Sequence, residues 1–344
     1  MRIRVLIVDD SAFVRKAVRR MLTADPDFEV VGEAADGRAA LDLARELVPD
    51  VITLDIQMPG WDGIEALERI LSEIPTSIVI FSSYAQNGAE LTLKALTAGA
   101  VDVVDKSRVS TMSLYELEKE LVAKLKAAAS SQRFAAPSIA GLGERADRPR
   151  ADLFVLGAST GGPRALQTIL SRLPLDFAAQ VLVVQHMPRG FSRALADRLD
   201  EVCPLAVREL ETGDALAPGE VGVAPGGSDV SLEPSEDGAR IAITPRDPRD
   251  AGTTPSIDRA LESAASYHGA TVCAVILTGM GEDGLRGCRA VRAVDGIVIA
   301  EAPATCIVYG MPRAVTEADL ASVAAPLHEI PGLMLALSGE RRRE

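Results

Sequence analysis

The sequence has few of the residues that build disulfides and metal clusters. It contains four cysteines and three histidines in 344 residues, and no two cysteines form a CxxC pair. The ligand spacing of structural zinc sites is therefore absent, and the scattered histidines exclude a histidine-rich metal cluster. This cysteine usage favours a reducing compartment, and we expect a cytoplasmic protein.

Long hydrophobic runs and a basic excess are missing as well. The apolar run that follows Met1-Arg2 is too short for a signal peptide or a membrane span, so we expect no membrane insertion. Residues 1–129 carry 15 basic and 21 acidic side chains, residues 130–344 carry 21 and 28, and the net charge is −13. Binding to nucleic-acid phosphates needs clustered Lys and Arg, so we expect no nucleic-acid partner.

The length predicts two domains at roughly 150 residues each. Residues 1–129 alternate short, continuous apolar runs with helical segments, which is typical of parallel strands covered on both faces. Five such units predict an α/β fold with a flavodoxin-like, five-stranded, doubly wound parallel sheet. The expected strands are Val5–Val8, Val30–Val31, Val51–Leu54, Ile78–Phe81 and Val101–Val104.

The pattern breaks at 130–150, a stretch rich in Ala, Gly, Pro, Ser and Arg that we interpret as an interdomain linker. Alternation resumes over 151–338, which predicts a second doubly wound α/β domain, and 339–344 form a polar tail. Its expected strands are Leu153–Leu156, Val181–Val184, Thr271–Leu277 and Ile297–Ala300, and its expected helices include Arg164–Leu173, Ser192–Glu201 and Pro255–Tyr267. Residues 204–245, with many Gly and Pro, predict a hairpin region.

Polar residues follow the expected strands of the first domain. Asp9 and Asp10 come after the first strand, Asp55 after the third, Ser82 after the fourth and Lys106 after the fifth. Carboxyl ends of parallel strands meet at one edge, so these carboxylates should cluster there. Such a cluster is costly unless a hard cation compensates it, and Mg²⁺ prefers oxygen ligands. One carboxylate could attack a phosphoryl group whose oxygens the lysine and hydroxyl hold.

These positions, with the segment Leu54–Gly63, resemble the receiver domain of two-component response regulators over about residues 1–125. The resemblance implies phosphorylation of Asp55 by a partner histidine kinase. It also implies that Mg²⁺ is held by Asp9, Asp10 and Asp55. Ser82 and Lys106 would sense the phosphoryl group.

Two residues depart from the receiver pattern. Ser107 stands where the family usually has proline, and Val103 stands where an aromatic residue is common. The first departure affects the loop after the lysine, and the second affects how a signal leaves the site. Taken alone, Asp9 and Asp10 would also suit a helix cap beside Ser11.

The second domain opens with a strand, a glycine-rich turn and a helix start, Leu153–Leu156 followed by Gly157–Pro163. Gly-x-Ser-x-Gly around Ser159 matches the nucleophile-elbow pattern, in which small neighbours permit a sharp turn and expose the hydroxyl. Pro163 suits the first turn of a helix. A phosphate-binding turn is a competing interpretation, but the spacing fails both the GxGxxG and the P-loop pattern.

A serine nucleophile needs a base. His186 follows the strand Val181–Val184, which places it at the same sheet edge as Ser159. Asp283 follows the strand ending at Leu277 and could orient His186. The order Ser…His…Asp differs from that of α/β-hydrolases, so the elbow pattern does not argue for that fold.

Each of these residues, taken singly, also has a purely structural interpretation. Taken alone, Ser159 could be a turn or cap residue, and Asp283 could cap the following helix. His268 and His328 follow helical stretches, and we expect them to be solvated or structural.

The whole arrangement resembles the CheB family of chemotaxis protein-glutamate methylesterases over about residues 152–337, in the receiver–linker–hydrolase order of that family. The motifs that carry the resemblance are Gly157–Pro163, Gln185–Pro188, Ala224–Gly226, Thr278–Gly284 and Tyr309–Pro312. It implies hydrolysis of glutamate γ-methyl esters, and deamidation of glutamines, on the cytoplasmic helices of methyl-accepting chemoreceptors. It also implies that the kinase that phosphorylates Asp55 is a chemotaxis histidine kinase of the CheA type. No metal or cofactor is expected in the esterase site.

In that interpretation Ser159 is the nucleophile, His186 the base and Asp283 the group that orients the base. Backbone N–H groups near Met280 and His186 are expected to stabilise the oxyanion, and Thr160 to support the site. We also expect the unphosphorylated receiver to cover the catalytic face.

Two alternatives stay open. The first is a noncatalytic response regulator whose second half binds a protein or DNA. The acidic balance and the lack of a recognisable helix-turn-helix weigh against DNA, and the three catalytic candidates weigh against the whole alternative. The second is a phospho-regulated serine esterase that acts on a receptor outside chemotaxis. The sequence does not separate this alternative from a methylesterase that acts on chemoreceptors.

Overall fold

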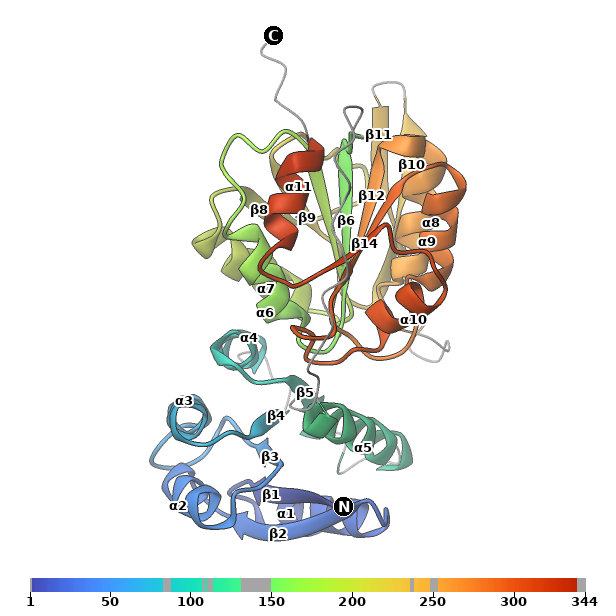
Figure 1. Ribbon diagram of the computed structural model, residues 1–344. Coiled ribbons are helices and arrows are strands. Elements are labelled where there is room, and N and C mark those ends of the chain that lie inside the picture. Colours follow the sequence, from blue (N-terminus) through green and yellow to red (C-terminus); the bar gives the residue numbers. More distant parts are fainter. Residues whose placement is uncertain are drawn as a thin grey trace. The chain divides into compact units, whose positions relative to one another are not determined.

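The computed structural model describes residues 2–82, 88–106, 109, 114–130, 150–235, 238–247 and 253–338. The chain divides into two compact units, Met1–Arg133 and Phe134–Glu344, which Figure 1 shows in blue to green and in green to red. Residues 131–149 of the predicted linker, the predicted tail 339–344 and Ser107 lie outside the described residues.

The N-terminal unit is a five-stranded parallel sheet with the order β2-β1-β3-β4-β5. Its strands are β1 (Ile3–Val8), β2 (Phe28–Ala34), β3 (Val51–Leu54), β4 (Ser77–Ser82) and β5 (Asp102–Asp105). Its helices are α1 (Ala12–Thr23), α2 (Gly37–Leu47), α3 (Gly63–Glu73), α4 (Gly88–Ala98) and α5 (Leu114–Ser130). Helices α1 and α5 pack together, as do α2, α3 and α4 (Figure 1). The predicted five-stranded α/β sheet is confirmed.

Burial explains why the apolar runs became strands. Every residue of β3 and β4 is buried, as expected for strands covered by helices on both faces. Helix α5 buries an apolar stripe at helical spacing, because Leu117, Leu121 and Leu125 are all 0% exposed.

The strand order creates a switch point between β1 and β3. The chain leaves β1 through α1 toward β2, and it leaves β3 through α3 toward the opposite edge of the sheet. The Asp55 N–H donates to the Val8 carbonyl at 2.9 Å, so the end of β3 is tied to the end of β1. Loops that diverge at such a point leave a crevice at the carboxyl ends of the strands.

The C-terminal unit is a seven-stranded parallel sheet with the order β14-β13-β12-β6-β7-β9-β8. Its strands are β6 (Leu153–Ala158), β7 (Gln180–Gln185), β8 (Ala206–Glu209), β9 (Glu220–Val223), β12 (Val272–Ile276), β13 (Ile297–Glu301) and β14 (Val323–Ala325). Its helices are α6 (Gly162–Leu170), α7 (Phe191–Val202), α8 (Ile257–His268), α9 (Leu285–Ala293), α10 (Met311–Glu317) and α11 (Ile330–Ser338). Helices α6, α7 and α11 lie on one face and α8 and α9 on the other (Figure 1).

Only the second half of the predicted hairpin region 204–245 forms a hairpin. The antiparallel pair is β10 (Ser228–Ser235) with β11 (Gly238–Pro245), whereas β8 and β9 join the main sheet as parallel strands. The valines of β9 are both 0% exposed, so that short run is covered on the sheet rather than half solvated. The hairpin packs against α8, where Val230 and Ile241 enter the same core as Ala260 and Leu261.

A second switch point lies between β6 and β12. From β6 the chain proceeds through α6 to β7, and from β12 it proceeds through α9 to β13 on the other side. Ser159 directly follows β6, and residues 277–284 follow β12. Both loops therefore open from the middle of the sheet. None of the described helices is long and apolar enough to cross a membrane.

The buried face of α5 generates a stability prediction. Leu121→Ala should lower the free energy of unfolding of the N-terminal unit by roughly 2–5 kcal/mol, because it leaves a cavity in a close-packed core. Phe13→Ala is the matched control in the same unit, because Phe13 is 66% exposed and its loss should cost no more than roughly 0.5 kcal/mol. Calorimetric melting of the full chain measures both, and equal costs for the two variants would contradict the packing described for α5.

Candidate functional site

Three carboxylates meet at the β1/β3 switch point. Asp9, Asp10 and Asp55 each place one carboxylate oxygen within 4.8 Å of the others. Asp9 and Asp55 are 1% and 0% exposed, whereas Asp10 faces solvent. The Asp9 carboxylate also accepts the Ser11 N–H at 2.9 Å, and the Ser11 hydroxyl caps α1. The cap predicted as an alternative is thus supplied by Ser11, which leaves the aspartates to the cluster.

Lys106 reaches this cluster from the end of β5. Its Nζ donates to Asp9 Oδ2 at 3.2 Å and also to Asp55 Oδ2. Ser82, the last residue of β4, is 2% exposed and pairs in register with Asp105, the residue before Lys106. Four strand ends therefore supply the five predicted residues to one edge of the sheet.

Burial dominates the electrostatics of this edge. It raises the pKa of Asp9 and of Asp55 above the ordinary carboxyl value, and each carboxylate is only partly relieved by Lys106. Burial works against the charge of Lys106 too, but its contacts with Asp55 and Asp9 outweigh burial and raise the pKa of the ammonium group. Two buried carboxylates with a single lysine between them remain short of positive charge. A hard divalent cation with oxygen ligands fits this donor set.

In the C-terminal unit, Ser159 lies on the turn between β6 and α6. Its N–H donates to the Thr278 carbonyl at 3.0 Å, which continues the β6–β12 pairing beyond the strand ends. Gly279 lies against the serine, because a Cβ added there would be 2.7 Å from the Ser159 Cβ. Helix α6 begins at Gly161 in the left-handed region, with φ 81° and no side-chain cap. The turn is therefore sharp and crowded, as the glycine pattern predicts.

His186 and Asp283 form a direct pair next to this turn. His186 Nε2 lies 2.8 Å from Asp283 Oδ2, and the two side chains are 8% and 14% exposed. Asp283 also accepts the N–H groups of Ile257 and Asp258 at 2.9 and 3.0 Å, so it caps the start of α8. Burial opposes the charge of Asp283, but the His186 hydrogen bond and these N–H groups lower the pKa of the carboxyl below its ordinary value.

The ring of His186 is oriented by this pair. Because Nε2 is taken by Asp283, the nitrogen left for a nucleophile is Nδ1, which is buried and has no hydrogen-bond partner among the described residues. Ser159 and His186 are neighbours across the β6–β7 ladder, but no hydrogen bond joins the Ser159 hydroxyl to His186 in the described residues. Such a contact often forms only with substrate in place.

Of the two backbone N–H groups at His186 and Met280, one is already hydrogen-bonded and the other has no such bond in the described residues. We expected N–H groups near Met280 and His186 to face the oxyanion, but the His186 N–H itself is not free for this, because it donates to the Ala158 carbonyl at 3.0 Å. The β6–β7 ladder simply continues by one residue. The Gly279 carbonyl accepts the N–H groups of Gly310 and Met311, and in a trans peptide the Met280 N–H points the opposite way. No bond from the Met280 N–H occurs within the described part of the chain.

Comparison with known proteins fits both halves of this geometry. Residues 5–115 match the model of the response regulator receiver domain, and residues 154–334 match that of the CheB methylesterase. A protein-glutamate methylesterase/protein-glutamine glutaminase of Symbiobacterium thermophilum is 43% identical, covering 98% of both chains. The chain belongs to the CheB family. A relative of that name from Thermotoga maritima is 40% identical over 97% of this chain and 98% of its own length.

A solved structure agrees with the C-terminal unit. The crystal structure of the Thermotoga maritima CheB methylesterase catalytic domain superposes with a TM-score of 0.52 at 40% identity, covering 54% of this chain and 98% of that one. Membership of the CheB family accounts for the order of a receiver followed by a catalytic domain.

The side chain of Gln185 helps to hold the Ser159 turn, a role that the sequence motif Gln185–Pro188 did not predict. Gln185 is 3% exposed, and its Nε2 donates to the carbonyls of Ser159 and His186 at 2.9 and 3.0 Å. A Cβ on Gly162 would lie 1.9 Å from Gln185 Oε1, so that position has no room for a side chain. A polar residue at the buried end of the apolar run 181–184 was the available signal. Thr160, predicted as support, is 4% exposed, and its carbonyl accepts the Thr278 hydroxyl at 2.9 Å.

The bonding of Asp283 generates a prediction on stability. Its folded-state pKa lies below the ordinary value of 3.8, so its contribution is fully present above about pH 4 and is lost as the pH falls through the folded pKa. Asp283→Asn should therefore melt below the wild type at pH 6, with a gap that closes as the pH falls toward 3. The exposed Asp176→Asn should show no such dependence. A gap for Asp283→Asn that is constant from pH 7 to pH 3 would contradict the lowered pKa.

Proposed function

We propose that this chain is a phosphorylation-regulated serine hydrolase. It removes methyl groups from glutamate γ-methyl esters on the cytoplasmic helices of chemoreceptors and deamidates glutamines there. The His186–Asp283 pair beside the Ser159 turn carries this proposal, since a hydroxyl becomes a nucleophile only next to an oriented base. The names of its CheB-family relatives, protein-glutamate methylesterase/protein-glutamine glutaminase, supply the ester and amide substrates.

The first half of the reaction forms an acyl-enzyme. The Ser159 oxygen attacks the side-chain carbonyl carbon of the substrate while His186 Nδ1 takes the hydroxyl proton. The tetrahedral oxyanion receives the Met280 N–H, and one such donor is worth roughly 2.7–4 kcal/mol of transition-state stabilisation. Collapse expels methanol or ammonia, which takes the proton from Nδ1, and a γ-glutamyl ester of Ser159 remains.

The second half regenerates the enzyme. A water molecule gives a proton to Nδ1 and attacks the ester carbonyl, and the proton then returns to the Ser159 oxygen as glutamate leaves. Asp283 holds Nε2–H throughout and stabilises the imidazolium that forms twice in the cycle. The product carries one more negative charge than either the ester or the amide, so the reaction changes the electrostatics of the receptor helix.

The receiver supplies the regulation. In this proposal Asp55 accepts a phosphoryl group from a chemotaxis histidine kinase, and Lys106 and Ser82 bind the phosphoryl oxygens. Asp9, Asp10 and Asp55 would hold Mg²⁺, which when bound neutralises the crowded carboxylate and phosphoryl charges. Phosphorylation changes the charge at the edge of the receiver sheet, and this biases the chain toward a more active hydrolase state.

Removal of the nucleophile tests the hydrolase directly. Ser159→Ala should lower methanol release from radiomethylated chemoreceptors by roughly 10⁶-fold in kcat, because no covalent intermediate forms. The variant should still incorporate phosphate at Asp55. Ser171→Ala, at the exposed C-terminal cap of α6, is the matched control and should keep full activity.

Two outcomes would contradict parts of this proposal, and a comparison of receptors separates it from the alternative of a serine esterase that acts outside chemotaxis. Full methanol release by Ser159→Ala would refute the nucleophile. Release of methyl groups only from receptors outside chemotaxis would contradict the proposed substrate and leave the serine chemistry intact.

The receiver has its own test. Asp55→Asn should incorporate no phosphate from the kinase and should lose the stimulation of hydrolysis, while basal methanol release is unchanged. Chelation of divalent cations should have the same two effects on the wild type. The matched control is Asp42→Asn, whose carboxylate is 68% exposed on α2. Phosphate retained by Asp55→Asn, or stimulation that survives chelation, would contradict the assignment.

A further inference from the structure

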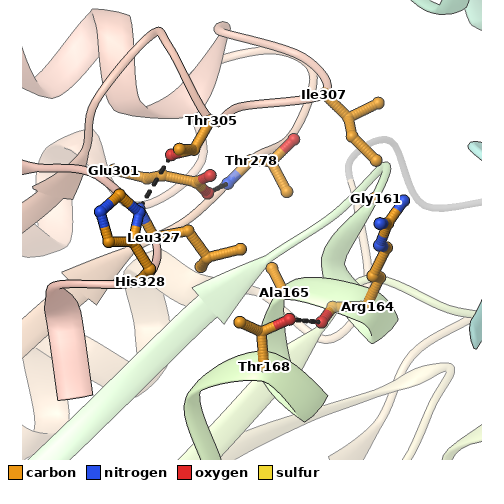
Figure 2. A pocket seen from close by; sticks show the side chains of 10 residues that line it. All are labelled: Gly161, Arg164, Ala165, Thr168, Thr278, Glu301, Thr305, Ile307, Leu327 and His328. Atoms are coloured by element: carbon orange, nitrogen blue, oxygen red, sulfur yellow. Dashed lines mark hydrogen bonds between the residues drawn. The ribbon is translucent and has the colours of Figure 1, made fainter.

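A buried carboxyl group that the mechanism above does not use lies behind the nucleophile turn. Glu301 is the last residue of β13 and is 0% exposed. It borders a pocket of about 350 Å³ between the strand ends and α6. In Figure 2 its carboxyl group lies between Thr278 and Thr305, while Arg164 and Thr168 project from α6 across the pocket.

Glu301 is connected to Ser159 through one residue. Its Oε2 accepts the Thr278 N–H at 2.9 Å, and the Thr278 carbonyl accepts the Ser159 N–H at 3.0 Å. The Thr278 hydroxyl donates to the Thr160 carbonyl and accepts the Val308 N–H, each at 2.9 Å. Thr278 is therefore fixed at its amide, its carbonyl and its side chain. The amide end of this arrangement is held by Glu301.

No cation among the described residues forms an ion pair with this carboxyl group. Its Oε1 has no hydrogen-bond partner among those residues either. The titratable or charged groups around it are Arg164 from α6, His328 from the turn before α11, and Cys306, whose Sγ donates to the Glu301 carbonyl at 3.6 Å. The site is thus better suited to a neutral carboxylic acid than to a carboxylate.

We propose that Glu301 is a positioning residue for the esterase reaction, that it acts through the Thr278 amide, and that it does so as the neutral acid. This inference rests on the proposed function. A neutral carboxyl oxygen still accepts the Thr278 N–H and holds the loop that faces Ser159 and carries the Met280 N–H. An ionised Glu301 adds a buried negative charge at Thr278, on the loop that also carries the Met280 N–H, and its repulsion of the developing oxyanion slows the acylation step.

The titration of the group agrees with this geometry. Burial raises the pKa of Glu301 to about 7, although the hydrogen bond from the Thr278 N–H opposes that rise. A group with this pKa loses its proton near neutral pH. The alkaline side of the pH profile should therefore contain a decline that belongs to Glu301.

Two substitutions separate position from charge. Glu301→Gln keeps an oxygen that accepts the Thr278 N–H and removes the ionisation. Its kcat should equal that of the wild type at pH 6, and at pH 8.5 it should exceed the wild type by at least about threefold. Glu301→Ala removes the acceptor, and kcat should fall roughly 10- to 100-fold at every pH with little change in KM. Methanol release by the full chain from the methylated receptor measures both, with the exposed Glu317→Gln as control.

A second measurement needs no substrate. The folded-state pKa lies above the ordinary value of 4.5, so ionisation costs the wild type stability as the pH rises from about 4.5 to 7. Glu301→Gln should therefore melt with the wild type at pH 4.5 and at a higher temperature at pH 8. This measurement also serves if Glu301→Ala fails to fold.

The outcomes are distinct. If the wild type releases no methanol from any receptor, the proposed function is wrong and the positioning role falls with it. The difference in melting temperature between Glu301→Gln and the wild type at pH 8 still tests whether Glu301 is neutral. With an active wild type, identical pH profiles for Glu301→Gln and the wild type overturn the role of the neutral acid. Full kcat in a folded Glu301→Ala overturns the positioning role.

Discussion

The catalytic unit depends on the hydrogen bond from the Ser159 N–H to the Thr278 carbonyl. It extends the pairing of β6 with β12 past the point where both strands end, at the switch point where their loops turn to opposite faces. Without it, the serine turn and the glycine-rich loop would be two independent loops. With it, Ser159, Gly279 and the Met280 N–H have fixed relative positions on a rigid sheet, which is what electrostatic preorganisation requires.

The two units use the same kind of crevice for different chemistry. At the β1/β3 switch point the side chains supply formal charge, three carboxylates and one lysine, and burial leaves that site short of cations. At the β6/β12 switch point the site relies on backbone dipoles, one imidazole and one ionised carboxylate. The first arrangement suits a phosphoryl group and a divalent cation, and the second suits a neutral ester that becomes an oxyanion.

Sequence patterns predicted which residues come together but not which atoms bond. Because parallel strands end at one edge, the positions of Asp9, Asp55 and Lys106, or of His186 and Asp283, follow from the apolar runs alone. Whether an N–H remains free depends on where a ladder stops, and the β6–β7 ladder continues far enough to use the His186 N–H. That detail has no sequence signal, nor does the choice of Nε2 for Asp283.

Sequence patterns also do not show what covers a strand or a side chain, and this explains the incorrect prediction for β8 and β9. Short Val-rich runs at β8 and β9 have the appearance of hairpin strands, because sequence shows neither the partner strand nor the cover above it. No role was predicted for Glu301, nor for Gln185 beyond its place in a motif, because each is a single polar residue at the end of an apolar strand, where solvent exposure is the ordinary expectation. Their burial depends on loops that arrive from elsewhere in the chain.

Asp283 illustrates how one group can serve both folding and the proposed catalysis. Its carboxylate caps α8 and binds His186, so the N–H groups that stabilise the helix also keep the carboxylate ionised for the imidazole. The helix N-terminus favours that negative charge, which offsets part of the cost of burial. The position of His186, the proposed base, is thereby tied to the start of a helix packed in the core, and its ring cannot turn without breaking the bond to Asp283. A hydrolase built this way has its base oriented before substrate arrives.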